Sequence, residues 1–180
     1  MLEFQKSRTY ANLMAAFAGE SQARNKYTFY AAEAKNQGFE QIGRLFQETA
    51  DNEKEHAEIW FKQLHDNSMP ATVDALKDAA EGEWYEFSDM YKQFAKEAEE
   101  EGYLEIAALF KMVGNIEKEH HERFKKLMKN VEDGIVFKRD GVRIWKCLNC
   151  GHIHVGESAP KACPVCKKPQ AWFEIKAENY

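Results

Sequence analysis

Hydrophobic residues recur every three or four positions along most of the first 133 residues. This spacing places side chains on one face of an α-helix. The pattern predicts four long helices, which are separated near Gly38, near residues 67–70 and near Gly102. Their approximate ranges are 8–35, 39–65, 72–100 and 103–129. Four amphipathic helices in two closely connected pairs predict a four-helix bundle.

The two halves of this helical region repeat each other at an offset of 64 residues. Ile42 recurs as Ile106, and Leu45 recurs as Leu109. The block Glu-Lys-Glu-His at residues 53–56 recurs at residues 117–120. The repeat predicts two copies of one helical hairpin related by a pseudo-twofold axis, which suits a pair of like metal ions.

Acidic and imidazole side chains interrupt the apolar faces of the predicted helices. These residues are Glu20, Glu53, His56, Glu83, Glu117 and His120. Burying unpaired carboxylates is costly, so we expect cations beside them. Glu53 and His56 are three residues apart and share a helix face, as do Glu117 and His120. One Glu from each of two helices and Glu-x-x-His from each of the other two is the ligand set of ferritin-like di-iron proteins.

The position of each expected ligand on its helix indicates its role at the metal site. Glu53 and Glu117 are the natural bridges between two ions, and His56 and His120 would each complete the coordination of one ion. Glu86 adds a fifth carboxylate, three residues after Glu83 in the chain. A surplus ligand would permit exchange when iron changes its oxidation state.

Two tyrosines, Tyr27 and Tyr91, repeat at the same offset and fall near the acids. Their hydroxyl groups could donate hydrogen bonds to the ligands. They could equally be core aromatic residues whose hydroxyl groups find other partners.

From about residue 134 to residue 180 the pattern changes to short β-like runs with several prolines and glycines. All four cysteines lie here, as Cys147-x-x-Cys150 and Cys163-x-x-Cys166. Two such pairs make a tetrahedral four-thiolate metal site, although the spacing does not separate iron from zinc. We therefore expect a bundle over residues 1–133 and a small metal domain over residues 134–180.

The composition excludes several classes of protein. The 180 residues include 30 acidic and 25 basic side chains, a net charge of −5, which argues against bulk nucleic-acid binding. There is no run of 18 apolar residues for a membrane span, and the N-terminus lacks the pattern of a signal peptide. Clustered cysteine pairs fit a metal site in a reducing compartment, so we expect a cytoplasmic protein.

With these motifs in order, nearly the whole chain resembles the rubrerythrin family. The matching features are the run Phe-Ala-Gly-Glu-Ser-Gln-Ala-Arg-Asn at residues 17–25, both Glu-x-x-His blocks, Glu83-x-x-Glu86 and the two cysteine pairs. The resemblance implies a mainly α fold, a ferritin-like four-helix bundle with a small C-terminal rubredoxin-like β/loop metal domain. It also implies that the bundle acids and histidines, including Glu86, hold two iron ions. The four cysteines would hold a third iron, with zinc as a possible substitute. His152 stands where a tyrosine is common in the family.

The resemblance implies a non-haem di-iron peroxidase that reduces hydrogen peroxide to water in oxidative-stress defence. Electrons would come from an NAD(P)H-dependent reductase or a rubredoxin, through the rubredoxin-like centre. In the family, the residues matching Glu86 and His56 alternate as ligands of one iron. Two other classes stay open, a ferroxidase or iron-storage protein and an electron-transfer or zinc-binding module. An attached redox centre argues against storage, and the acids on the apolar faces argue against a plain module.

The connection between the second and third predicted helices is short for a ferritin-like bundle. These two helices run parallel in such a bundle, so the connection must climb along it. Residues 66–72 span at most about 23–25 Å when extended, which is barely enough. A simple up-and-down connection, or exchange of hairpins between two chains, would relieve the problem. We expect a homodimer, possibly with swapped hairpins, or a higher homo-oligomer.

Overall fold

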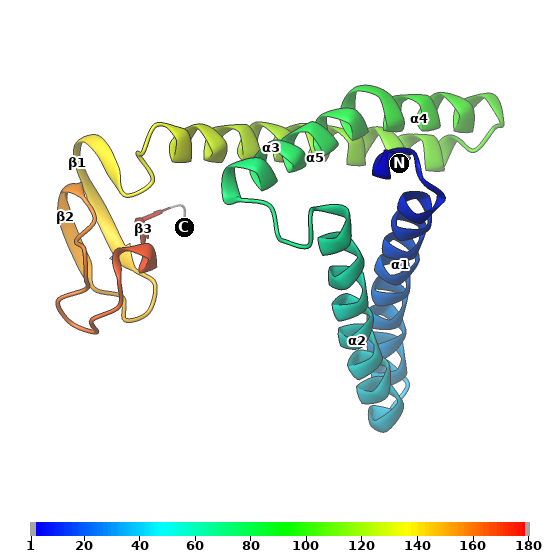
Figure 1. Cartoon of the computed structure of the whole chain (residues 1–180), viewed down its shortest axis with the longest axis horizontal. Coiled ribbons are helices and arrows are strands. Elements are labelled where there is room, and N and C mark those ends of the chain that lie inside the picture. The colour runs from blue at the N-terminus through cyan, green and yellow to red at the C-terminus, as the bar shows by residue number, and fades with distance from the viewer. Residues whose placement is uncertain (1–2, 179–180) are drawn as a thin grey trace. The chain divides into compact units, whose positions relative to one another are not determined.

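The structure is a computed structural model that describes residues 3–178. It divides into two compact units, Met1–Pro70 and Ala71–Tyr180. The first unit holds one helical hairpin, and the second holds another hairpin followed by a small β domain (Figure 1). Within residues 3–178, no helix is both long and apolar enough to span a membrane.

The first unit is a pair of long antiparallel helices. After a short 3-10 turn, η1 (Phe4–Lys6), helix α1 (Arg8–Asn36) is followed by helix α2 (Glu40–Leu64). The Ser7 side chain caps α1 by accepting a hydrogen bond of 3.1 Å from the Tyr10 amide. Gly38 takes a φ of 84° in the turn between the helices, a conformation that glycine adopts without strain. Both helices lie within one residue of their predicted ranges.

The second unit begins with another hairpin. Helix α3 (Thr72–Tyr85) continues through a π-helical segment, η2 (Glu86–Met90), into helix α4 (Tyr91–Glu100). Helix α5 (Leu104–Glu132) packs back against them (Figure 1). The predicted helix over residues 72–100 has the correct extent, but the sequence pattern did not predict the π-helical segment inside it.

The π-helical segment explains an irregularity in the internal repeat. Glu20 and Glu83 are 63 residues apart, whereas Tyr27 and Tyr91 are 64 residues apart. A π turn accommodates one extra residue in an α-helix, and η2 lies between Glu83 and Tyr91. The second hairpin therefore carries one inserted residue relative to the first. The inserted residue lies in η2, and Glu86, the surplus carboxylate, is the first residue of that segment.

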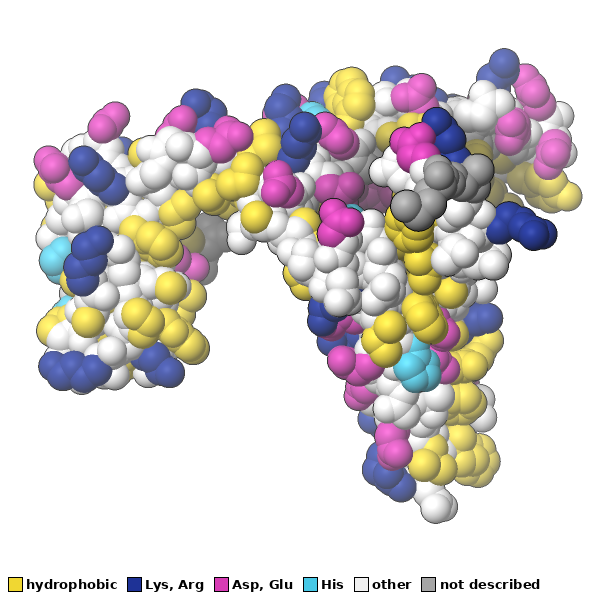
Figure 2. All heavy atoms as spheres, viewed as in Figure 1, with side chains coloured by type: hydrophobic (Ala, Val, Ile, Leu, Met, Phe, Trp, Pro, Cys, Tyr) yellow, Lys and Arg dark blue, Asp and Glu magenta, His cyan; other side chains and the backbone are white. Residues whose placement is uncertain are grey.

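Small residues fill the line along which the helices of each hairpin meet. The buried helical residues in the described range are Ala31, Ala34, Gly43, Ala50, Ala57, Ala80, Ala95, Ala98, Ala107 and Gly114. Larger apolar residues on these helices stay exposed, such as Ile42 (47% exposed) and its repeat equivalent Ile106 (46%). Figure 2 shows such side chains on the surface of the first hairpin. The predicted apolar faces therefore exist, but neither unit covers its own face.

The rest of the second unit is a small antiparallel sheet. Strands β1 (Lys138–Cys147), β2 (Ile153–Ser158) and β3 (Phe173–Ile175) lie in the order β2-β1-β3, with a 3-10 turn, η3 (Gln170–Trp172), before β3. The core beneath them consists of Trp145, Cys147, Ala159, Cys163 and Phe173. Trp145 Nε1 donates a hydrogen bond of 3.0 Å to the carbonyl of Gly156, which joins β1 to β2. Two of the four cysteines thus belong to the core.

We expect Gly43→Ala to lower the free energy of unfolding by about 1 kcal/mol. The new Cβ would lie 2.7 Å from Lys35 Cγ and 3.0 Å from the Ala31 carbonyl oxygen. Overpacking of this kind costs about 1–3 kcal/mol, which exceeds the gain of about 1 kcal/mol in helix propensity. Chemical denaturation would measure the change. The exposed control Gln41→Ala should stay within about 0.5 kcal/mol of the unchanged protein. A Gly43→Ala protein as stable as the unchanged one would contradict the close approach of α1 and α2.

Candidate metal centres

Three of the predicted iron ligands converge in the first hairpin. Glu20 from α1 and Glu53 and His56 from α2 each offer a ligand atom, and these atoms lie within 4.8 Å of one another. His56 Nδ1 is 2.9 Å from Glu53 Oε2 and 4.0 Å from Glu20 Oε2. We call this group the first half-site. The i, i+3 spacing on α2 aligns two of its members, and the close packing of α1 supplies the third.

The second hairpin repeats the arrangement. Glu83 from α3 and Glu117 and His120 from α5 bring ligand atoms within 4.8 Å of one another. His120 Nδ1 is 2.8 Å from Glu117 Oε2 and 3.6 Å from Glu83 Oε2. This second half-site has the same residue types in the same order as the first. The structure therefore brings together six of the seven predicted bundle ligands, as two groups of three.

The surroundings of two of these acids shift their pKa values in opposite directions. Hydrogen bonds with His56 and then with Glu20 lower the pKa of Glu53. The pKa of Glu83 is raised, first by burial and then by its hydrogen bond with Glu117 and that residue's charge. Two carboxyl groups and an imidazole aimed at one point suit a divalent cation, which would relieve the repulsion. The donor set of each half-site therefore fits iron.

Glu86 and Tyr91 lie near the second half-site without belonging to it. Burial raises the pKa of Tyr91, and the negative charges of Glu86, Glu117 and Glu83 raise it further. The phenol therefore keeps its proton close to the acids, as a hydrogen-bond donor would. Glu86 contributes to the raised pKa of Glu83 but is not among the three clustered ligands. Both tyrosines also pack against a phenylalanine: the ring centroids of Tyr27 and Phe46 are 6.1 Å apart, and those of Tyr91 and Phe110 are 5.9 Å apart.

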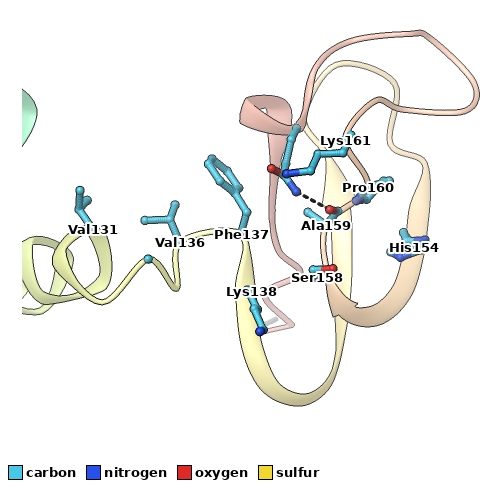
Figure 3. Close-up of a pocket in the computed structure, with 11 residues that line it drawn as sticks. Val131, Val136, Phe137, Lys138, His154, Ser158, Ala159, Pro160 and Lys161 are labelled. Atoms are coloured by element: carbon cyan, nitrogen blue, oxygen red, sulfur yellow. Dashed lines mark hydrogen bonds between the residues drawn. The ribbon is translucent and has the colours of Figure 1, made fainter.

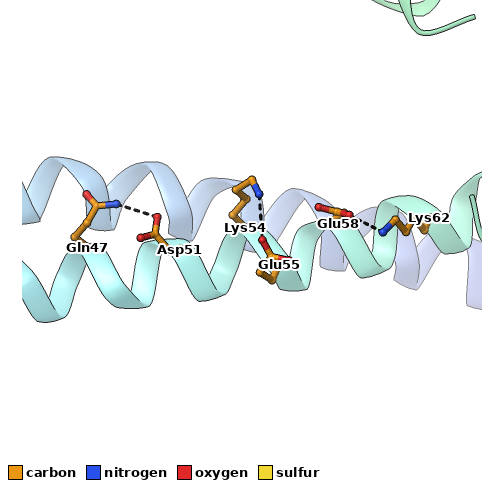
Figure 4. Close-up of polar contacts among 6 residues, drawn as sticks. All are labelled: Gln47, Asp51, Lys54, Glu55, Glu58 and Lys62. Atoms are coloured by element: carbon orange, nitrogen blue, oxygen red, sulfur yellow. Dashed lines mark hydrogen bonds and ion pairs between the residues drawn. The ribbon is translucent and has the colours of Figure 1, made fainter. Parts of the chain in front are cut away.

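Neighbouring acids on α2 are engaged in surface ion pairs. Figure 4 shows Glu58 paired with Lys62 at 2.5 Å and Glu55 paired with Lys54 at 3.1 Å. Both pairs lie along one helix at the surface, where Glu58 and Lys62 are half-buried and Lys54 and Glu55 are exposed, so they add little to stability. These two acids of α2 are thus held by lysines, whereas Glu53 faces His56.

The four cysteines form the rubredoxin-like metal site. Cys147 Sγ is 3.7 Å from Cys166 Sγ, and Cys150 Sγ is 3.6 Å from Cys163 Sγ. Four sulfurs bonded at about 2.3 Å to one tetrahedral ion would be about 3.8 Å apart. The thiols therefore already stand at the separation that a metal ion requires.

Two matching turns set this separation. The Gly151 amide donates to the Cys147 carbonyl at 2.8 Å, and the Lys167 amide donates to the Cys163 carbonyl at 3.0 Å. Gly151 and Lys167 take φ values of 76° and 64°. The first value suits glycine, whereas Lys167 takes the left-handed conformation despite its side chain. The second turn is therefore strained, and its geometry was not evident from the sequence.

Two of the thiols, those of Cys150 and Cys166, have pKa values shifted in opposite directions. A hydrogen bond from the Lys168 amide lowers the pKa of Cys166 to about 6. The His152 amide also lowers the pKa of Cys150, but burial and the other three cysteines outweigh it and raise that pKa to about 12. In the metal-free protein the first proton therefore leaves Cys166.

A surface hollow of about 670 Å³ lies between the end of α5 and the small sheet (Figure 3). Its described lining includes Val131, Val136, Phe137 and Lys161, and no residue of either half-site or of the cysteine site is part of that lining. Gln170 beside it donates a hydrogen bond to the Ala159 carbonyl. The hollow is thus separate from the metal chemistry.

Two Glu/Glu/His half-sites on helical hairpins and an appended four-cysteine domain define the ferritin-like di-iron class of proteins with a rubredoxin-like centre. The family model described as Rubrerythrin matches residues 11–128, and the model described as Rubrerythrin, rubredoxin-like domain matches residues 145–174. The chain belongs to the rubrerythrin family. The predicted mainly α fold, the di-iron site and the four-cysteine site are confirmed.

The chain is also similar to individual proteins. The chain is 47% identical to Rubrerythrin-1 of Clostridium acetobutylicum, over 100% of both chains. It is also 47% identical to the rubrerythrin of Porphyromonas gingivalis, over 97% of this chain and 92% of the relative. A solved structure of nigerythrin, titled as a mixed-valence state, is 33% identical over 98% of this chain and 92% of that chain, with a TM-score of 0.36.

We expect Cys166 to react first when the metal-free protein meets an alkylating reagent at pH 7. The thiolate is the reactive form, and a pKa of about 6 leaves Cys166 ionised there while Cys150 stays protonated. Labelling of Cys166 should fall as the pH drops through about 6. Peptide mass spectrometry would locate the label. In the unfolded protein all four cysteines should react alike, and the same equality in the folded metal-free protein would contradict the assignment.

Proposed function

We propose that the protein is a non-haem di-iron peroxidase that reduces hydrogen peroxide to water. An NAD(P)H-dependent reductase, or a rubredoxin, would supply electrons to the four-cysteine centre, which would pass them to the iron pair. The observation that carries the proposal is the presence of two equivalent Glu/Glu/His half-sites and a redox-type thiolate site in one chain. The four ligand thiols must stay reduced, which favours a cytoplasmic location.

The proposed iron ligands are Glu20, Glu53, His56, Glu83, Glu86, Glu117 and His120. The two histidines would each bind one ion through Nδ1, the atom that already faces the carboxylates. The paired glutamates would neutralise the positive charge of the ions. When bound, the iron pair supplies the two electrons that cleave the O–O bond, and two protons complete two water molecules.

Side chains of the protein would donate hydrogen bonds near the site where those protons are needed. Tyr91 keeps its hydroxyl proton beside Glu83 and Glu117, because burial and three nearby negative charges raise its pKa. It is therefore the proposed hydrogen-bond donor that orients the carboxylates and the bound peroxide. Glu86 lies close to these groups on a π-helical segment, where the inserted residue alters the direction of the side chains that follow. Glu86 would be an additional carboxylate that could hold one iron ion in place of His56.

A ferroxidase or iron-storage protein would use the same helical ligands. The rubredoxin-like domain favours the peroxidase, because storage has no use for an attached electron-transfer centre. One ligand of that centre, Cys150, is exposed, so an external electron donor could reach the centre there. A simple electron-transfer module would leave the two half-sites without a role.

The deciding experiment compares oxidants on the fully reduced protein. Under anaerobic conditions, the iron-loaded protein is reduced by NADH with a reductase and then mixed with hydrogen peroxide or dioxygen. We expect rapid return of the ferric-thiolate absorption with peroxide. About three peroxide molecules should be consumed per two chains, because each chain gives up two electrons from its iron pair and one from its four-cysteine iron, and each peroxide takes two. Faster oxidation by dioxygen would favour the ferroxidase. A four-cysteine site holding only zinc would remove the electron route and contradict the proposal.

We expect Glu86→Ala to slow peroxide turnover about tenfold or more while most of the iron stays bound, since six other ligands remain. Stopped-flow oxidation and metal analysis would measure the two effects separately. Glu81→Ala is the matched control, because Glu81 lies on α3 as an exposed acid 4.0 Å from Lys77. The control should turn over peroxide at the unchanged rate. Normal turnover by Glu86→Ala would rule out ligand exchange at this position.

A further inference from the structure

We propose that His121 is a positioning residue for the second half-site. It binds no iron itself. Its side chain holds the stretch of α3 and η2 that carries Glu83 and Glu86 in register with the ligands on α5. The inference deepens the proposed function and rests on its ligand assignment.

The first observation is a hydrogen bond that joins the two helices. His121 lies on α5, directly after the ligand His120, and its Nδ1 is 2.7 Å from the carbonyl oxygen of Ala80 on α3. A carbonyl oxygen only accepts hydrogen bonds, so Nδ1 carries the proton and donates it. The side chain of His121 is 12% exposed and Ala80 is 4% exposed. Little water therefore competes for this contact, which strengthens it.

The hydrogen bond fixes α3 close to a metal ligand. Ala80 and Glu83 are three residues apart and share a face of α3. On α5, His121 is the neighbour of His120, whose Nδ1 is 3.6 Å from Glu83 Oε2. One donor and one acceptor thus join the two helices within about one turn of the point where their ligands meet. Sliding of α3 along α5 would break this bond and separate the ligands together.

The second observation is a row of ring contacts from His121 to the residue beside Glu86. The ring centroids of His121 and Trp84 are 5.0 Å apart, and those of Trp84 and Phe87 are 5.6 Å apart. The ammonium group of Lys118 on α5 lies 5.7 Å from the Phe87 ring centroid, within the range of a cation–π contact. The acidic segment is therefore tied to α5 at both of its ends.

The first hairpin shows that a hairpin of this kind does not need the histidine. The repeat equivalent of His121 is Ala57, which is buried. The equivalent of Ala80 is Phe17, at the offset of 63 residues that holds before η2. The Phe17 carbonyl accepts a hydrogen bond of 2.7 Å from Ser21 Oγ, which belongs to the same helix. That bond stays within α1 and ties no second helix to it.

This difference between the hairpins matches a difference in their ligands. The second hairpin has Glu86 at the start of η2, whereas the matching residue of the first hairpin is Ala23. A π turn disturbs the regular hydrogen bonds of a helix, so its side chains are directed less firmly by their own helix. Metal ligands must be held to within about 0.5 Å, so the irregular segment needs support from outside. His121 supplies that support from α5.

The test compares variants of His121 that place a donor at different points. The amide nitrogen of asparagine lies where Nδ1 of histidine lies, so His121→Asn keeps the bond to Ala80. The amide nitrogen of glutamine lies near the position of Nε2, so His121→Gln loses it. The dissociation constant of the iron pair, from competition with a chelator for ferrous iron, should rise about tenfold or more in His121→Gln and less than about threefold in His121→Asn. Equal losses in the two variants would overturn the inference.

Two spectroscopic readouts distinguish positioning from a general loss of stability. Mössbauer spectra report the coordination of each ferrous ion, so His121→Gln should alter the signal of the iron pair while His121→Asn leaves it unchanged. In the metal-free protein, long-range proton–nitrogen NMR should place the proton of the neutral His121 ring on Nδ1. A neutral ring that carries its proton on Nε2 would overturn the inference.

Ser21→Ala is the matched control. It removes the side-chain hydrogen bond from the repeat-equivalent carbonyl, that of Phe17, but that bond does not join two helices. Iron affinity and the Mössbauer spectrum should therefore stay unchanged. Equal effects of Ser21→Ala and His121→Gln would show that the link between the helices is not what matters, which would contradict the proposal.

A further variant covers the case in which His121→Gln does not fold. His121→Phe keeps a ring against Trp84 but lacks the donor, so it should lose iron affinity in the same way. The iron and NMR measurements do not depend on peroxide. If the unchanged protein holds the iron pair but reduces no peroxide, only the proposed function fails. If it reduces peroxide and both donor-free variants bind iron as tightly as the unchanged protein, only the role of His121 fails.

Discussion

Carboxylates that face one another on an apolar helix surface repel, and the helical part of the structure is organised around that repulsion. In each hairpin two glutamates and a histidine converge. In the second hairpin, burial first and then the neighbouring Glu117 raise the pKa of Glu83. A cation offsets the repulsion, so the metal is part of what stabilises the helices in this arrangement. The alanines and Gly43 between α1 and α2 let those helices approach closely enough for Glu20 to meet Glu53.

The small C-terminal domain depends on its metal in a different way. Its core has only a few large side chains, among them Trp145 and Phe173, and two of the remaining core members are cysteines. A domain of this size buries too little apolar surface to be very stable alone, so a metal ion that joins two turns supplies what the core lacks. One of its four ligands, Cys150, is exposed.

The sequence by itself determined the helices and the chemistry. The periodicity predicted the ends of α1 and α2 to within one residue of the observed ends. The internal repeat and the residue spacing identified the six half-site residues and the four cysteines. Both kinds of feature depend on residues close together in the chain. The change of offset from 63 to 64 was also visible, although only the structure revealed the π-helical segment at Glu86–Met90 behind it. The left-handed Lys167 and the acidity of Cys166 arise within the short turn from Cys163 to Lys168, but the spacing of the cysteines does not specify them. Tertiary structure alone decided the charge around Tyr91, because Glu117 reaches it from α5, a helix that no local pattern places beside α4.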